Sequence, residues 1–394
     1  MILSFDISEI AYILIATSAV LSEIYLWWLY SCSQMIGRNI GDDDIKDVIT
    51  SRDALPGVSV IIYAHNDAEF LQKNLPYILN QDYPDFEVIV VNDGFSDDDN
   101  NIVSEFRTQY TNIYLTFVPN NARNVSHKKL ALMVGIKAAK HDIIVTTNAN
   151  CRPESPNWLS AMARNFVPGI DVVIGQSKYD FASDRKMGRW FRSFDGVLTR
   201  MQYLSYAIDG KPYRGTSDNL AYRRQTFFAN KGFSRSMNLH YGDDDIFVSE
   251  IADGYNTRVE LTADSYMTAE YSNYSHTASE SKMRHDFTSR YIDTSAFTVW
   301  GVMAAVYFLD FLSIAALDVL NYLHIVILGI SLLLVLALTL PQIFILRRTA
   351  RLLHAPRMFF ALPLFTLLRP IVNLHYLLKG QRYRTQNFTW QRAK

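Results

Sequence analysis

The chain has 394 residues and a formal net charge of −1, and 49% of its residues are hydrophobic. The near-zero charge argues against proteins that bind nucleic acid through a broad basic face, and the length predicts two or three structural units. Two cysteines, Cys32 and Cys151, lie far apart in the sequence. No disulfide framework is therefore expected, and a reducing compartment is favoured.

An apolar segment near the start of the chain, at residues 10–30, is long enough to cross a hydrocarbon core of about 30 Å. It contains one charged residue, Glu23, and ends in tyrosines and tryptophans, which favour a membrane interface. A cleaved signal peptide is the alternative, but its basic region and small-residue cleavage site are missing. We therefore expect a transmembrane anchor at residues 1–31 and a linker at 32–55.

Two strand-like runs and a helical segment occupy residues 58–99. The runs, 58–63 and 86–91, are apolar and rich in β-branched residues, as in strands that are buried on both faces. Between them, apolar residues at helical spacing predict a helix at 68–80. The second strand ends beside Asp93, so this aspartate is expected at the carboxyl edge of a parallel sheet, where open α/β sheets bind ligands.

Further strands are expected at residues 113–118, 143–147 and 171–175, and an amphipathic helix at 128–140. Strands that alternate with helices in this way predict an α/β fold with a mostly parallel sheet covered by helices. We expect this domain to occupy residues 56–295.

Two more apolar segments, 296–317 and 323–346, predict a pair of transmembrane helices within residues 296–346. The link between them has no lysine or arginine, whereas the loop at 347–357 has four arginines, which favours a cytoplasmic location for that loop. Basic residues also follow the first span and do not precede it. Both ends therefore predict a multi-pass protein of the inner or cytoplasmic membrane, with residues 32–295 in the cytosol.

The last apolar stretch, residues 358–378, is interrupted by two prolines and by Arg369, and the tail after it is basic. If this stretch crossed the membrane, the basic tail would lie outside. We therefore expect residues 347–394 to form a basic loop, an interfacial or re-entrant helix and a basic tail.

The strings VSVIIYAHNDAEF and EVIVVNDGFSDD resemble the opening of the family 2 inverting glycosyltransferases, which usually read VSVIIPAYNE and EVIVVDDGSTD. The chain departs from that pattern at Tyr63, His65 and Asn92. The resemblance covers roughly residues 56–290. It implies a GT-A fold, a Rossmann-like architecture that binds nucleotide sugars.

The resemblance implies a nucleotide site around Asp93, because the matching aspartate of the family binds the base. Ala64 is expected at the same site. The HKKLAL segment resembles GKxxAL, so Lys128 and Lys129 become candidates for phosphate contact, and Lys129 is assigned to the nucleotide. From the residues alone, Asp93 could instead cap the following helix, and the lysines could be a solvated helix start.

Asn148 and Asn150 stand where the family has the DxD motif, whose carboxylates help to bind Mg²⁺ or Mn²⁺ at the donor diphosphate. Each amide offers an oxygen but no charge, and hard cations prefer charged oxygen ligands. The resemblance therefore leaves three alternatives, which are weakened metal binding, metal-independent catalysis and lost activity.

The segment HYGDDDIFVSEIADGY resembles the ED motif that precedes a helix in the family, where an aspartate is the general base. Counting back from Gly254 favours Asp243 as that base, and aligning the GDD string favours Asp244, so both stay candidates. Adjacent carboxylates raise one another's pKa, which suits a base. The alternative is an acidic helix N-cap, and the two roles are compatible.

Two further segments complete the implied site. Arg284 and His285 match the Q-x-x-R-W-type motif of membrane-bound relatives, in which the arginine contacts the diphosphate leaving group. The alternative for Arg284 is contact with anionic lipid, which Arg290 could equally make. The segment at 215–222 resembles the one that shapes the acceptor and sugar pocket, through Ser217, Asp218 and Asn219.

The sequence thus implies a membrane-bound inverting glycosyltransferase that uses a nucleotide sugar, UDP-linked by resemblance, and a lipid-linked or glycan acceptor. Its product would belong to cell-surface polysaccharide or glycolipid. One alternative is a polysaccharide synthase subunit that needs partner chains. Another is a catalytically silent scaffold that binds nucleotide sugar. No nucleic-acid partner is expected.

Overall fold

The computed structural model describes residues 7–43, 46–93, 97–118, 125–179, 188–271, 274–355 and 362–387. The chain divides into two compact units. The first, the helical unit, comprises Met1–Gly37, Trp190–Ser205 and Thr294–His375. The second, the sheet unit, comprises Arg38–Arg189, Tyr206–Asp293 and Tyr376–Lys394. Trp190–Ser205 thus belongs with the apolar helices, although it lies inside the stretch expected to be one domain, 56–295.

A seven-stranded sheet with the strand order β3-β2-β1-β4-β8-β6-β9 forms the centre of the sheet unit. Its pairs are parallel except for β8, which runs antiparallel to both β4 and β6. The α/β fold with a mostly parallel sheet expected from the sequence is therefore confirmed. The strands are β1 (Val58–Ala64), β2 (Phe86–Asn92), β3 (Ile113–Phe117), β4 (Ile143–Asn148), β6 (Val172–Ile174), β8 (Leu220–Arg223) and β9 (Thr257–Val259).

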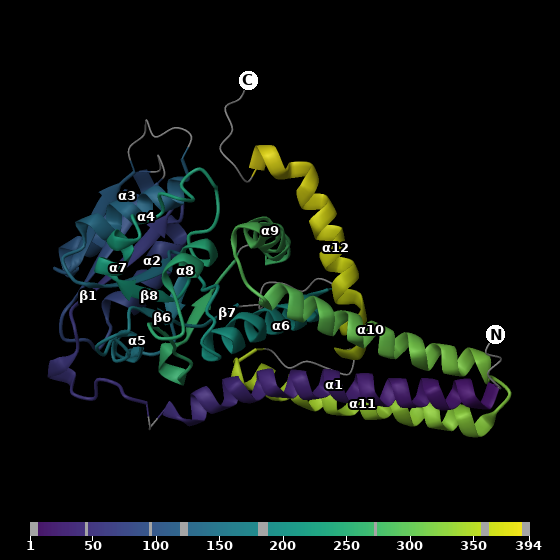
Figure 1. The fold of residues 1–394 in the computed structure, drawn as a ribbon. Coiled ribbons are helices and arrows are strands. Elements are labelled where there is room, and N and C mark those ends of the chain that lie inside the picture. Colours follow the sequence, from purple (N-terminus) through teal and green to yellow (C-terminus); the bar gives the residue numbers. More distant parts are fainter. Residues whose placement is uncertain are drawn as a thin grey trace. The chain divides into compact units, whose positions relative to one another are not determined.

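A second, three-stranded sheet has the order β5-β10-β7, with β5 at Cys151–Pro153, β7 at Ser177–Tyr179 and β10 at Met267–Ala269. Helices pack around the sheets (Figure 1). They are α2 (Ala68–Leu79), α3 (Asp97–Gln109), α4 (His127–Ala138), α5 (Trp158–Ala163), α7 (Arg224–Ala229), α8 (Asp245–Ile251) and α9 (Tyr274–Thr288).

The central strands are buried because their β-branched side chains lie between helices on the two faces of the sheet. Val58, Val60 and Ile62 of β1 are fully buried in one core with Leu71 and Leu75 of α2. On the other face, Gly135 lets α4 lie close to the sheet, since a Cβ atom there would come within 2.7 Å of Ile61. This close packing fixes α4, whose first turn carries residues of the candidate site.

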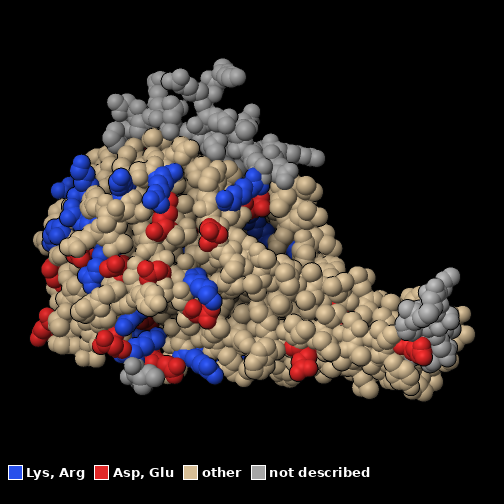
Figure 2. Space-filling model, in the orientation of Figure 1, with Lys and Arg blue, Asp and Glu red and all other residues tan. Residues whose placement is uncertain are grey.

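The helical unit contains three helices that are long and apolar enough to cross a membrane, at Glu9–Gly41, Ala296–Leu320 and Ile325–Leu352. They correspond to α1 (Ile7–Gly41), α10 (Ala296–Leu320) and α11 (Ile325–Leu352), which run side by side in Figure 1. On the face shown in Figure 2, few charged side chains lie on these helices. The three apolar helices expected from the sequence are thus present, and α1 continues into the segment expected to be a linker.

Polar contacts hold these apolar helices together. Asp310 of α10 is fully buried and accepts hydrogen bonds from Ser18 and Ser22 of α1, each at 2.5 Å. The helical unit also includes part of α6 (Arg189–Ile208) and part of α12 (Leu362–Asn387), where Arg369 forms an ion pair with Asp195 at 2.8 Å. This pairing accounts for the charge inside the apolar stretch at 358–378. Whether that stretch crosses the membrane stays a prediction.

Candidate active site

The candidate site lies at the carboxyl ends of β1, β2 and β4. Strand register brings the expected residues to this edge, because Ala64 pairs with Asn92 and Tyr63 pairs with Asn148. Asp93 follows Asn92 directly, and its amide donates a hydrogen bond to the Ala64 carbonyl at 2.9 Å. Ala64 therefore contributes its backbone to this edge.

Two side chains of the protein hold the carboxylate of Asp93. The Tyr63 hydroxyl donates to Oδ2 at 2.9 Å, and Nδ1 of His127 lies 2.8 Å from Oδ1. Burial, followed by the charge of Asp93, raises the pKa of Tyr63 well above its usual range, which keeps the phenol protonated as a donor. His127 was not among the expected site residues. Its position directly before the two lysines was the available signal.

The two lysines at the start of α4 make different contacts. Lys129 is fully buried, and its ammonium donates to the carbonyls of Ser236 at 2.7 Å and Tyr241 at 2.8 Å. Burial lowers the pKa of Lys129 to about 8. Lys128 instead lies 3.0 Å from the Ser217 hydroxyl and 2.8 Å from Oδ2 of Asp243. Lys129 thus anchors the loop before α8, and Lys128 is the lysine that reaches the acidic cluster.

The acidic cluster begins at Gly242, whose φ of 105° lies in the left-handed region that favours glycine. Asp244 is the N-cap of α8, and its Oδ1 accepts from the Asp245 amide at 2.9 Å. Its Oδ2 accepts from the Ser217 amide at 3.3 Å. Asp245 is 2% exposed, and it accepts from the Thr288 hydroxyl and from the Ile246 amide. Asp243 and Asp244 therefore remain the two candidates for a base.

The surroundings of Asp243 and Asp244 drive their pKa values in opposite directions. Burial acts to raise the pKa of Asp243, but Lys128 and Arg284 outweigh it and bring the pKa below its usual range. Burial, followed by the charges of Asp243 and Asp245, raises the pKa of Asp244 to about 6. Asp244 therefore has the more suitable proton affinity for a base near neutral pH.

Helix α9 supplies Arg284 and His285, and they face different neighbours. The guanidinium of Arg284 lies 4.2 Å from the ring centroid of Tyr241. Burial acts to lower its pKa, but the charges of Asp244 and Asp243 raise it further, so Arg284 is a fixed cation beside the acidic cluster. His285 contacts Arg214, and burial together with that charge lowers its pKa well below the usual range.

The segment expected to shape the sugar pocket divides into three roles. Ser217 faces the cluster, through its contacts with Lys128 and Asp244. Asn219 is fully buried, donates to the Gln176 carbonyl at 3.0 Å, and accepts from the Trp158 indole at 3.0 Å. Asn219 therefore supports the site from inside the protein. Asp218 is 5% exposed and accepts a hydrogen bond from Asn148 at 2.7 Å.

The residues at the DxD position do not fit a tightly held divalent cation. Asn148 donates to Asp218, and Asn150 donates to the Glu270 carbonyl at 2.7 Å. Within the described residues, no group of three or more His, Cys, Asp or Glu side chains could hold a metal ion. Amide oxygens without carboxylates are poor ligands for Mg²⁺ or Mn²⁺.

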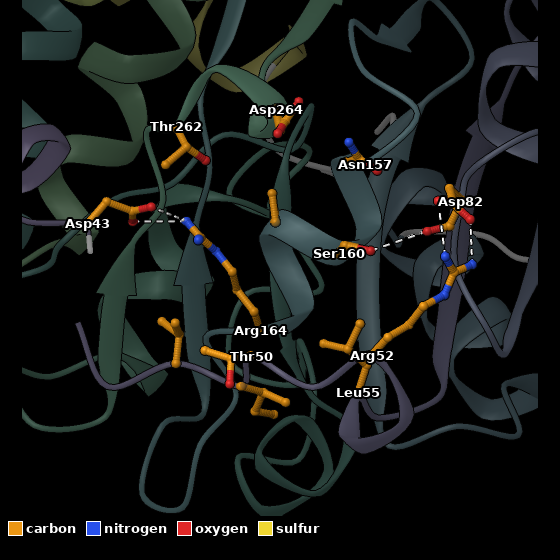
Figure 3. A pocket seen from close by; sticks show the side chains of 13 residues that line it. Asp43, Thr50, Arg52, Leu55, Asp82, Asn157, Ser160, Arg164, Thr262 and Asp264 are labelled. Carbon is orange, nitrogen blue, oxygen red and sulfur yellow. Dashed lines mark hydrogen bonds and ion pairs between the residues drawn. The ribbon is translucent and has the colours of Figure 1, made fainter. Parts of the chain in front are cut away.

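A separate cavity of about 500 Å³ lies beside the segments that lead into β1 and β2 (Figure 3). Two arginines line it, and each is already paired. Arg52 bonds Asp82 at 3.1 Å, and Arg164 bonds Asp43 at 2.8 Å. This cavity contains none of the residues expected at the active site.

Comparison with known proteins finds a matching family profile and similar sequences. Residues 59–231 match the profile of Glycosyl transferase family 2. The chain is 28% identical over 146 residues to the glycosyltransferase AglE of Haloferax volcanii, which covers 36% of this chain and 46% of that protein. It is also 28% identical over 154 residues to a poly-beta-1,6-N-acetyl-D-glucosamine synthase of Staphylococcus epidermidis, covering 38% of this chain and 33% of that protein. The matched region thus spans less than half the length of these curated relatives.

A solved structure has the same fold. The mannosyltransferase PcManGT from Pyrobaculum calidifontis, in complex with GDP-Man and Mn²⁺, aligns with a TM-score of 0.56 and 16% sequence identity. The alignment covers 94% of this chain and 99% of that one. Residues 59–231 thus match Glycosyl transferase family 2, and the chain has the GT-A fold of that solved glycosyltransferase.

Proposed function

We propose that this protein is a membrane-bound inverting glycosyltransferase, which moves a sugar from a nucleotide sugar to a lipid-linked or glycan acceptor. The observation that carries this proposal is the arrangement around Asp244. A carboxylate with a raised pKa lies beside two cations, Lys128 and Arg284, at the same sheet edge as Asp93. A base next to fixed positive charge suits the transfer of a group from a diphosphate.

In the proposed reaction, Asp244 accepts the proton of the acceptor hydroxyl as that oxygen attacks the anomeric carbon. The new glycosidic bond forms while the bond from that carbon to the diphosphate oxygen breaks. The electron pair leaves with the nucleoside diphosphate, and Lys128 and Arg284 stabilise the charge that develops there. A single in-line displacement inverts the anomeric configuration.

Asp93 is proposed to receive the nucleotide base. Its carboxylate is held from both sides by Tyr63 and His127, so it is fixed before a ligand arrives. An oxygen of this carboxylate can still accept a ring N–H, because each carboxylate oxygen has more than one acceptor site. We propose UDP as the nucleotide of the donor.

The proposed setting is the assembly of cell-surface polysaccharide or glycolipid at the cytosolic face of the cytoplasmic membrane. The three long apolar helices and the names of the relatives support it. A synthase subunit that requires partner chains is the alternative that the helices also support. The uncharged Asn148 and Asn150 favour, as a further candidate, a silent protein that binds nucleotide sugar.

The proposed function is tested by incubating the purified full chain in lipid nanodiscs with UDP-sugars and measuring UDP release, with and without Mn²⁺. We expect UDP release under at least one condition, and weaker UDP binding in the Asp93→Asn variant. UDP binding without release under any condition would support the silent alternative. Failure of both binding and release would contradict a UDP-sugar enzyme.

The pH dependence follows from the raised pKa of Asp244. A base must be ionised to accept a proton, and Asp244 is protonated below its pKa of about 6. We therefore expect the transfer rate to fall about tenfold per pH unit below that value and to level off above it. Rates measured between pH 5 and 8 would show this acidic limb, and its persistence in Asp244→Asn would exclude Asp244 as its source.

Membrane topology gives another prediction, which is tested by labelling single introduced cysteines. Cys32 and Cys151 are buried, whereas Tyr322, Arg351 and Lys379 are exposed. With an impermeant maleimide on intact cells, we expect Tyr322→Cys to be labelled, and Arg351→Cys and Lys379→Cys to be labelled only after permeabilisation. Labelling of Lys379→Cys in intact cells would show that residues 358–378 cross the membrane.

A further inference from the structure

We infer that this protein balances the charge of the donor diphosphate with Lys128 and Arg284 rather than with a tightly bound divalent cation. The reason is that the carboxylate next to Asn148 is that of Asp218, which is turned into the protein. This inference rests on the proposed function. It concerns which groups neutralise the diphosphate at the same site, and it assigns Asp218 the role of positioning the Asn148 side chain.

Asp218 is enclosed by donors from the protein. Its Oδ1 accepts from Nδ2 of Asn148 at 2.7 Å, and its Oδ2 accepts from the Ser177 hydroxyl at 3.0 Å. The residue is 5% exposed. Both oxygens therefore have partners, and the carboxylate is not presented to a ligand as the carboxylates of a DxD motif would be.

The contact also fixes the orientation of Asn148. An ionised carboxylate can only accept hydrogen bonds, so the amide must turn its NH₂ group toward Asp218. The Asn148 oxygen then points away from Asp218. Asp218 thus leaves a neutral amide oxygen at the position where a metal site of this fold has negative charge.

Two other carboxylates near this edge, those of Glu270 and Asp243, face protein cations. Asn150 donates to the Glu270 backbone, while the Glu270 carboxylate lies 2.5 Å from Lys73 and 3.5 Å from Arg152. Asp243 is paired with Lys128 at 2.8 Å. A divalent cation beside Asn148 and Asn150 would meet amide oxygens, and the carboxylates of Glu270 and Asp243 are already matched by protein cations, so both are weak sites for a hard ion.

Positive charge is instead supplied by the protein. The Lys128 ammonium lies 3.0 Å from the Ser217 hydroxyl, which is itself 3.4 Å from Nδ2 of Asn148. Lys128 is therefore one side chain away from the DxD position. With Arg284, it supplies two positively charged donors, and charged donors bind phosphate oxygens strongly.

The first test measures UDP binding to the purified full chain by calorimetry, in EDTA and in Mn²⁺. We expect binding in EDTA, with an affinity that changes less than about threefold when Mn²⁺ is added. Binding only in the presence of Mn²⁺ would overturn the inference and leave the proposed function intact. Absence of UDP binding in both conditions would instead contradict the proposed function.

Lys128→Met provides the second arm, with Lys137→Met as its matched control at the exposed end of the same helix. Loss of a charged partner of the diphosphate should weaken UDP binding in EDTA by at least about tenfold in Lys128→Met. Lys137→Met should bind as the unaltered chain does. Equal affinities of the two variants would contradict the role of Lys128.

The third arm exchanges the carboxylate and the amide, through Asn148→Asp combined with Asp218→Asn. The exchange keeps the net charge and the hydrogen bond but moves the carboxylate to the outer position. In the presence of UDP, Mn²⁺ affinity measured by electron paramagnetic resonance should tighten at least about tenfold. Unchanged Mn²⁺ affinity in a folded double variant would overturn the role assigned to Asp218. If that variant does not fold, the first two arms still decide the inference.

Discussion

Replacing Asp244 by asparagine is expected to lower the rate of sugar transfer by about 10²–10⁴-fold, the usual contribution of a general base. Asparagine is also a good N-cap, so the substitution can keep the hydrogen bond at the start of α8, and it removes proton acceptance together with the long, 3.3 Å bond from the Ser217 amide. UDP affinity and the melting temperature should therefore stay close to their original values. Turnover, UDP binding and thermal unfolding, measured on the same preparation, check the three parts of this expectation.

Two further variants make the result for Asp244 interpretable. Asp253→Asn, in the exposed turn after α8, is the matched control and should retain full turnover. Asp243→Asn tests the neighbouring candidate, whose carboxylate is paired with Lys128. Near-normal turnover of Asp244→Asn, together with strong loss in Asp243→Asn, would transfer the role of base to Asp243. Loss of folding in both variants would point to a structural role for the cluster.

Arg284→Ala is expected to lower the transfer rate by about 10²–10³-fold, because a fixed donor at developing negative charge typically contributes that much. The guanidinium is held over the ring of Tyr241, whose hydroxyl donates to Glu280 at 2.8 Å. This support holds the cation in place. Single-turnover measurements at saturating donor would separate this effect on the chemical step from weaker donor binding.

Arg290→Ala is the matched control for Arg284, because Arg290 lies just beyond the end of α9 and is 36% exposed. If Arg284 stabilises the leaving group, only Arg284→Ala should lose turnover in detergent, where anionic lipid is absent. If both variants lose activity equally, and anionic vesicles change the activity of both, the arginines act through the membrane surface. In that case the leaving-group role of Arg284 would be wrong.

Much of the fold followed from local sequence patterns. The β-branched runs at β1 and β2 and the amphipathic spacing of α2 and α4 depend on side-chain periodicity, which a sequence displays directly. The three apolar helices were visible for the same reason, since a membrane-length segment is defined by composition and length. The placement of Asp93 also followed, because the end of a parallel strand determines the edge at which the next residue lies.

The partners of adjacent residues could not be derived in this way. Lys128 and Lys129 begin the same helix, and the rotation of α4 about its own axis decides which ammonium enters the loop and which reaches Asp243. That rotation depends on the packing of Gly135 against Ile61, far along the helix. The sequence therefore indicated both lysines as candidates, and only the tertiary structure distinguished their contacts.

The sequence by itself thus determined the family resemblance, the strand edge that carries the site and the missing charges at Asn148 and Asn150. Tertiary structure alone decided that Tyr63 and His127 hold Asp93, and that Asp218 holds Asn148. The physical reason is sequence separation. These contacts join segments 30–70 residues apart, and their geometry depends on the packing of the whole sheet unit rather than on any local pattern.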